Sequence, residues 1–133
     1  MQLNDARKAI YDRFTAAWGS TTAFCFYGEA FDSTQHLEWV RVTVKSLPGS
    51  QDTLGAAGNR KFMRTGIIFV QITVPDGEGT SRADQLAQLV STIFEGTRFS
   101  GIWVYETNVQ EQDSDDKNLL YLVESTFNYE DIK

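Results

Sequence analysis

The spacing of apolar residues predicts a helix close to the N-terminus. One set recurs at intervals of three and four residues, as expected for a single helical face: Ala6, Ile10, Phe14 and Ala17 with Trp18. Asn4 is a suitable N-cap, and Gly19 is a suitable residue to end the helix. We therefore expect a helix over residues 4–18.

A second helical pattern follows a turn-forming segment at residues 75–79. Residues 81–84 read Ser-Arg-Ala-Asp, which resembles a capping box with Asp in place of the usual Glu or Gln. The apolar stripe consists of Ala83, Leu86, Ala87, Val90, Ile93 and Phe94. The pattern predicts a helix that runs to about Glu95 and stops at Gly96.

Alternation of apolar and polar residues predicts four main strands. Their ranges are 37–45, 62–74, 102–109 and 119–127, and Pro75 ends the second. A shorter apolar segment at residues 23–27 is either a further strand or an extended arm. Residues 47–61, with one proline and three glycines, form a loop longer than usual hairpin connections, and we expect it to reach a neighbouring molecule.

The order of these elements indicates a single α+β domain over residues 1–133. Strands that are joined directly pair antiparallel, so we expect a mainly antiparallel sheet of about four strands, with two helices packed on one face. The other face would carry Arg41, Thr43, Thr73 and either Tyr105 or Thr107, and it could be solvated or covered by a partner.

Composition and charge narrow the functional classes. Twelve basic and eighteen acidic residues give a net charge of −6, which opposes tight binding to nucleic acid. No apolar run approaches the ~20 residues of a membrane helix. No secretory signal is visible at the N-terminus, so the chain is expected to be cytoplasmic.

The residues that could support catalysis are few. The chain has one histidine, His36, and one cysteine, Cys25, which is too few for a His/Cys zinc site. A Cys25–His36 pair is conceivable, but the apolar neighbours of Cys25 favour a buried structural thiol. We therefore expect no catalytic site, no metal and no cofactor.

Two local motifs imitate ligand sites. The Gly-rich segment 75–79 precedes a helix, as phosphate-binding turns do, but it supplies Asp76 and Glu78 where a phosphate loop would supply a lysine. The acidic residues 113–116 lack the glycine and the later glutamate of a calcium loop, and a solvated loop is the better interpretation.

One basic cluster stands out in this acidic chain. Arg60, Lys61 and Arg64 lie at the root of the long loop, and they are too few to bind DNA on their own. They either meet acidic residues of a partner or face water.

Several motifs in order along the chain suggest a family. After the first helix come the strand Trp-Val-Arg-Val-Thr-Val at 39–44 and a Gly-rich stretch with Leu54. Arg-Thr-Gly-Ile at 64–67 then opens a strand that ends Gln-Ile-Thr-Val-Pro at 71–75. Gly-Glu-Gly at 77–79, an Ala/Leu-rich helix and Phe-Glu-Gly-Thr at 94–97 complete the series. In this order and spacing, the chain resembles the tail terminator proteins of long, non-contractile-tailed bacteriophages and prophages.

The resemblance implies a structural role without enzymatic activity. Such a protein forms a hexameric ring of copies of itself at the head-proximal end of the tail tube, stops tube polymerisation and presents a surface for head-tail joining. Its partners would be the tail tube protein and the head-side connector protein, and DNA would pass through the ring without specific binding. It would reside in the host cytoplasm during assembly and in the virion tail afterwards.

Four residues are candidates for the ring or tube interface: Trp39, Leu54, Arg60 and Arg64. Trp39 could equally belong to the core. Two other functions remain open. One is a head-tail adaptor or tail-completion protein, and the other is a small ligand-binding domain that uses the segment 76–79.

Overall fold

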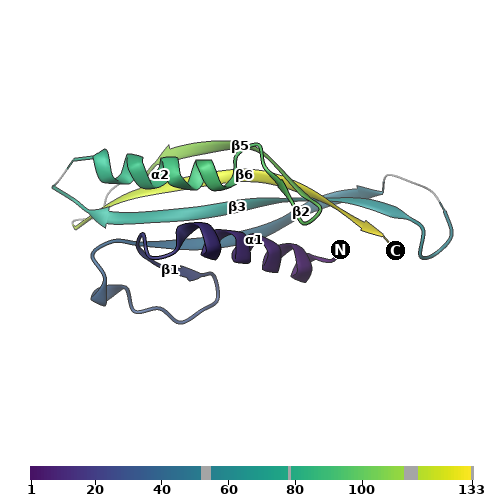
Figure 1. Ribbon diagram of the computed structural model, residues 1–133, viewed down its shortest axis with the longest axis horizontal. Coiled ribbons are helices and arrows are strands. Elements are labelled where there is room, and N and C mark those ends of the chain that lie inside the picture. Colours follow the sequence, from purple (N-terminus) through teal and green to yellow (C-terminus); the bar gives the residue numbers. More distant parts are fainter. Residues whose placement is uncertain (52–54, 78, 113–116, 133) are drawn as a thin grey trace.

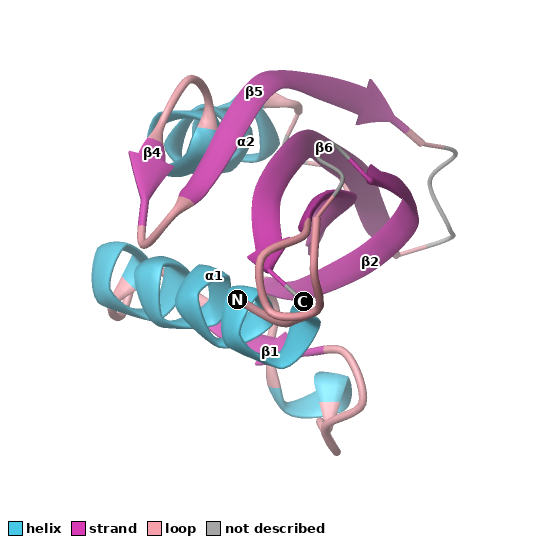
Figure 2. Cartoon of the chain, turned by 90° about the vertical axis from the view of Figure 1, so that its right-hand side faces the viewer, coloured by secondary structure: helices cyan, strands magenta, loops and turns pink. Residues whose placement is uncertain are grey.

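The computed structural model describes residues 1–51, 55–77, 79–112 and 117–132. Two helices lie on one face of a long, twisted sheet (Figures 1 and 2). The architecture is α+β, as the sequence predicts. No helix in the described ranges is long and apolar enough to cross a membrane.

Both helices form where the apolar periodicity places them. Helix α1 spans Leu3–Trp18, and the Gln2 amide donates a hydrogen bond to the Asp5 carboxylate at its start. Helix α2 spans Ser81–Phe94 and begins after Thr80 rather than at a Ser81 cap. Each helix ends immediately before the glycine or the Glu-Gly pair that the sequence marks as a stop.

The strands form one mixed sheet. They are β1 (Ala23–Phe26), β2 (Trp39–Gln51), β3 (Lys61–Pro75), β4 (Arg98–Phe99), β5 (Ile102–Glu111) and β6 (Asn118–Ile132). Their order across the sheet is β1-β2-β3-β6-β5-β4. Strand β1 runs parallel to β2, and every other neighbouring pair is antiparallel. A short 3₁₀ helix, Ser33–Gln35, lies between β1 and β2.

The prediction of about four antiparallel strands was therefore wrong in number and in part in direction. The described part of the chain forms six strands, because the short segment 23–26 adds a parallel strand at one edge and Arg98–Phe99 add a short strand at the other. Two-residue and four-residue strands are too short to show a clear alternation in sequence.

Part of the expected loop at 47–61 is strand. Strand β2 continues through Pro48 and Gly49 to Gln51, with a shift of register between Leu47 and Ser50, and β3 begins at Lys61. Proline is tolerated there because β1 covers β2 only as far as Val42, so the outer side of β2 has no strand partner among the described residues. The resulting hairpin projects beyond the helices (Figure 1). We call its residues 45–65 the arm.

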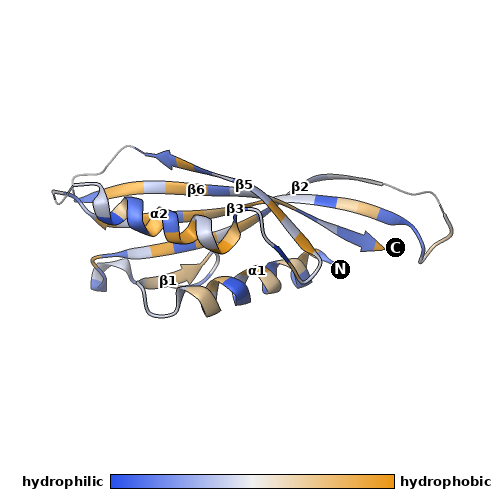
Figure 3. Cartoon of the chain, turned by 45° about the horizontal axis from the view of Figure 1, so that its top comes forward, coloured by the Kyte–Doolittle hydropathy of each residue, from blue (hydrophilic) through white to orange (hydrophobic). Residues whose placement is uncertain are grey.

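The hydrophobic core lies between the helices and the sheet. The buried faces of α1 and α2 meet alternate residues of β2, β3, β6 and β5, and the strand segments near the helices are predominantly hydrophobic (Figure 3). Phe14 is fully buried and packs on the rings of Trp18, Phe24 and Phe94. Cys25 is 4% exposed, which confirms the prediction of a buried thiol.

The opposite face of the sheet is only partly covered. Arg41 and Thr43 lie there half-buried, as predicted, whereas Thr73 is buried. Tyr105 belongs to this face, where its hydroxyl accepts a hydrogen bond from Asn128. Thr107 bonds to the buried Ser125 on the helix-covered side.

Candidate assembly surfaces

The potential catalytic pair is separated by burial. Cys25 sits in the core on β1, while His36 is exposed in the connection between β1 and β2, where it stacks on Phe31 with ring centroids 5.2 Å apart. Within the described residues no cluster of three or more His, Cys, Asp or Glu residues could hold a metal ion.

The turn after β3 has no ligand-site geometry. The Asp76 carboxylate accepts a hydrogen bond from the Gly77 amide at 2.8 Å, so it satisfies the turn itself. Asp76 and Gly77 are exposed and line neither of the described pockets. The acidic residues 113–116 lie outside the described ranges.

The described part of the arm carries two of the four candidate interface residues. Arg64 forms an ion pair with Asp131 at 3.4 Å, and its guanidinium lies 5.0 Å from the ring centroid of Phe62. Arg60 is half-buried near the tip of the arm, and its Nε has no partner among the described residues. Leu54 lies outside the described ranges.

Trp39 lies far from the arginines of the arm. It pairs with Thr73 at the opposite end of β3, nine residues from Arg64, which is roughly 30 Å at about 3.3 Å per residue. Trp39 is half-buried, packs against Phe31 at 5.4 Å and has Arg41 over its ring at 5.3 Å. The three described candidates therefore do not form one continuous surface.

A polar cluster fixes the root of the arm. Asp131 on β6 is 5% exposed and accepts ion pairs from Arg64 on β3 and from the terminal amine of Met1. Burial raises the pKa of the nearby Tyr129 hydroxyl, while Arg64 opposes that rise. The cluster ties the start of α1, the arm and the end of β6 together.

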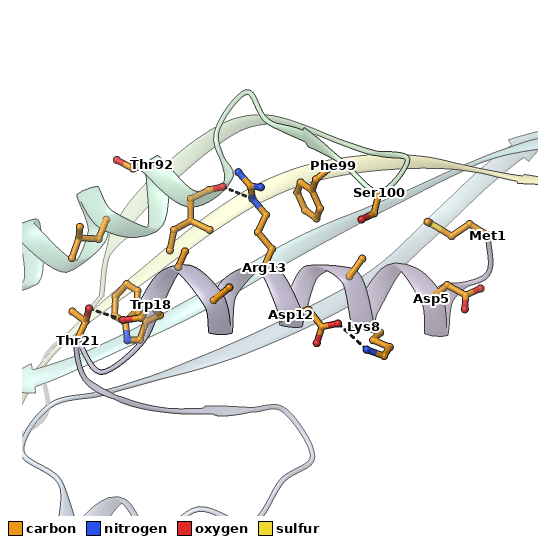
Figure 4. A pocket seen from close by; sticks show the side chains of 15 residues that line it. Met1, Asp5, Lys8, Asp12, Arg13, Trp18, Thr21, Thr92, Phe99 and Ser100 are labelled. Carbon is orange, nitrogen blue, oxygen red and sulfur yellow. Dashed lines mark hydrogen bonds and ion pairs between the residues drawn. The ribbon is translucent and has the colours of Figure 1, made fainter.

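A groove of about 950 Å³ runs along α1, between this helix on one side and α2 with the β4–β5 turn on the other (Figure 4). Small side chains of α1 form much of one wall: Ala9, Ala16 and Ala17. Leu89, Ile93 and Phe99 contribute apolar surface from the opposite side. The groove is therefore mainly apolar and open to solvent.

One cation is fixed inside this groove. Arg13 donates from its Nε to the Ile93 carbonyl at 2.9 Å, and its guanidinium lies 4.6 Å from the ring centroid of Phe99. Figure 4 shows this side chain between α1 and the β4–β5 turn. Lys8 and Asp12 pair with each other at 2.8 Å, whereas no described carboxylate pairs with Arg13.

The connection between β1 and β2 presents a second exposed apolar surface. We call its residues 27–38 the flap. Tyr27 is 71% exposed and Leu37 is 79% exposed, more than any other large hydrophobic residue in the described ranges. Aromatic contacts of Phe31 hold the flap in place, and Glu38 pairs with Arg82 of α2 at 3.0 Å. Both ends of the flap are therefore anchored.

The two outer edges of the sheet are partly open. Beyond Val42, no described strand pairs with the outer side of β2, although Arg7 donates to the Val44 carbonyl. At the other edge, β4 covers β5 only at Ile102 and Trp103. Unpaired strand edges are a common route to association between chains.

The groove and the flap escaped the sequence-based prediction. The pattern of α1 did not predict that Ala16 and Ala17 line a groove, because small exposed residues occur equally on an ordinary helix surface. Tyr27 and Leu37 were assigned to strand ends, where apolar residues are normally buried. The available signal was three large apolar residues, Tyr27, Phe31 and Leu37, in a segment otherwise rich in polar residues.

These features define a class of protein: a small α+β structural domain whose conspicuous surfaces suit contact with other proteins. A family model described as "Phage tail terminator protein" matches residues 5–115. The chain therefore belongs to the phage tail terminator family, and it has a structural role in a phage tail. The family is structural rather than enzymatic, and its members associate with other tail and head proteins.

A solved structure supports the fold over the whole length. It covers 100% of this chain and 99% of its own, with a TM-score of 0.74 and 16% sequence identity. At this identity the similarity concerns the fold alone. No match was found among curated proteins.

Proposed function

We propose that this protein is the terminator of a phage tail tube. It assembles as a ring on the head-proximal end of the tube. The ring has six copies, the number that the resemblance in sequence implies. The ring stops addition of further tube subunits and offers a surface to the head-side connector, and DNA passes through its opening. Assembly takes place in the host cytoplasm.

The observation that carries this proposal is the family match over residues 5–115. The shape of the sheet agrees with it, because its two outer edges are different and both are partly open. Contacts between unlike surfaces generate rings when the rotation between copies closes. The net charge of −6 also suits an opening that must not retain DNA.

The arm supplies the proposed contact with the tube. Arg60 and Arg64 stand on it, and Arg64 lies over the ring of Phe62, a combination typical of interface anchors. We retain these residues and Leu54 as candidates for the tube interface. Trp39, at the opposite end of the sheet, would belong to a different contact, between copies or with the connector.

Electron microscopy of tails assembled with and without the protein tests the proposal. Tubes of uncontrolled length in its absence, restored to uniform length by adding it, are the expected result. Finished tails of normal length that fail to join heads would instead identify a head-tail adaptor. Tubes unaffected by the protein in length and in joining would overturn both assignments.

A matched pair of variants sharpens the assay. Arg60→Ser and Arg98→Ser each remove one positive charge, the first on the arm and the second at an exposed position of β4, outside the arm and outside the groove. If the arm binds the tube, the arm variant should cap tubes poorly while the control variant caps them normally. Equal capping by the two variants would remove Arg60 from the tube interface.

A further inference from the structure

We infer that the flap of one copy docks in the α1–α2 groove of the next copy, with Tyr27 and Leu37 against the apolar walls and the flap carboxylates facing Arg13. The inference rests on the proposed ring and names the contact that would join neighbouring subunits.

The flap has the form of a preorganised knob. Its two apolar side chains are the most exposed of their kind in the described chain, and its backbone is fixed at both ends. The Tyr27 amide donates to Val42, and the ring of Phe31 packs between His36 and Trp39. A segment that is already ordered loses little conformational entropy when it binds.

The groove has the complementary form. It is open and mainly apolar, and the small side chains of Ala16 and Ala17 in its wall permit close approach of another chain. Helix α1 spans sixteen residues, about 24 Å at about 1.5 Å per residue.

The charges of the two surfaces also match. The flap carries Glu29, Asp32 and Glu38 and no lysine or arginine. Glu38 is engaged by Arg82, which leaves Glu29 and Asp32 on the exposed part. Hydrogen bonds from Thr34 lower the pKa of Asp32, so its carboxylate remains charged at neutral pH. The groove lining also holds Asp5, which accepts a hydrogen bond from the Gln2 amide, and the Lys8–Asp12 ion pair. Its remaining cation, Arg13, forms no ion pair with a described carboxylate.

The positions of the knob and the groove favour a head-to-tail contact. Figure 2 shows the flap beyond β1, on the other side of α1 from the space between α1 and α2. No residue of the flap lines the groove. Each copy therefore offers one knob and one groove in different directions, and repeated contacts of this kind can close a ring.

Three variants test the contact. Leu37→Glu disables the knob and Ala16→Glu fills the groove, while Thr15→Glu places the same charge on the neighbouring position of α1, outside the groove. All three sites are exposed, so the variants should fold, which circular dichroism can check. Leu37→Glu should weaken association by about 10- to 100-fold, the worth of burying one leucine side chain.

Mixing the variants gives the sharpest readout. Alone, the knob variant and the groove variant should each remain at the 15.0 kDa mass of one chain by sedimentation, while Thr15→Glu associates like the wild type. In a one-to-one mixture, the knob variant still has an intact groove and the groove variant still has an intact knob. Each pair can therefore form one contact, so association should stop at twice that mass. Larger assemblies of either single variant would overturn the inference.

A weak contact is detected by NMR. Unlabelled wild-type protein is added at about 1 mM to ¹⁵N-labelled Leu37→Glu protein. At this concentration even a contact with a Kd of about 1 mM is populated. Amides along the groove should shift, and unlabelled Leu37→Glu protein should shift none. No shift with either protein would overturn the inference.

Tube capping separates the flap contact from the proposed function. If Leu37→Glu caps tubes normally, only the flap contact is refuted, whereas failure of the wild type to cap refutes the terminator role.

Discussion

Replacing Gly66 by alanine should destabilise the protein more than its small size suggests. Gly66 is buried in β3, where it pairs with Ser46 of β2 and with Phe127 of β6. An added Cβ would lie 2.6 Å from the Lys45 carbonyl oxygen and 2.6 Å from Cε1 of Phe127. Neither neighbour can yield easily, since one is backbone and the other is a fully buried ring.

The magnitude follows from two opposing effects. Overpacking a buried site costs about 1–3 kcal/mol, and contact with a backbone atom places Gly66 near the upper end. Alanine also restricts the unfolded chain, which returns about 0.4–1 kcal/mol. The net loss is about 2 kcal/mol in the free energy of unfolding, or about 8 °C in Tm at about 4 °C per kcal/mol.

Urea unfolding followed by circular dichroism measures the loss, with Gly55→Ala as the matched control. Gly55 is exposed, and the nearest atom to an added Cβ there is 3.6 Å away. The control should therefore unfold within about 0.5 kcal/mol of the wild type, as surface substitutions usually do. If Gly66→Ala unfolds at the same urea concentration as the control, the close approach of Phe127 to β3 is not what requires glycine.

Three further substitutions have definite expected outcomes. Tyr121→Phe removes the 2.8 Å hydrogen bond from Tyr121 to Asp84 and should cost about 1 kcal/mol at pH 7. Burial, aided by that bond, raises the pKa of Tyr121 from 10.0 to about 12, so the neutral hydroxyl stabilises the wild type below pH 10. That contribution should be lost as the pH rises toward 12, and urea unfolding between pH 8 and 12 should show a larger loss in the wild type than in the variant. Phe14→Ala opens a cavity against three aromatic rings and should cost about 3–5 kcal/mol by thermal unfolding. Glu38→Gln breaks a half-exposed ion pair with Arg82, so unfolding at low salt should shift by no more than about 1 kcal/mol, and at 1 M salt by less.

The helices could be predicted from sequence because their apolar period has few alternatives. Ile10 and Val90 lie at the centres of unbroken stripes, and Gly19 and Gly96 mark the ends. The main strands were also found, but their lengths were not. Pro48 and Gly49 have the local chemistry of a turn, and only the open side of β2 explains why a strand can continue through them.

The candidate surfaces were harder to predict because they depend on which elements lie next to one another. The groove exists only because α1 and α2 flank the β4–β5 turn, a relation that no local pattern encodes. The basic residues of the arm were visible in sequence, yet the ion pair between Arg64 and Asp131 joins positions 67 residues apart. The family resemblance came from motif order, and the family model bears it out.

Pro48 has a consequence for the free protein before it reaches a tail. It stands in the strand whose outer side is open, and it has no amide hydrogen to donate to an incoming strand. A second sheet that approached this edge would meet a gap in the hydrogen-bond ladder and the register shift beside it. The edge is thereby protected against unlimited stacking into fibrils, a hazard for any concentrated β-rich protein.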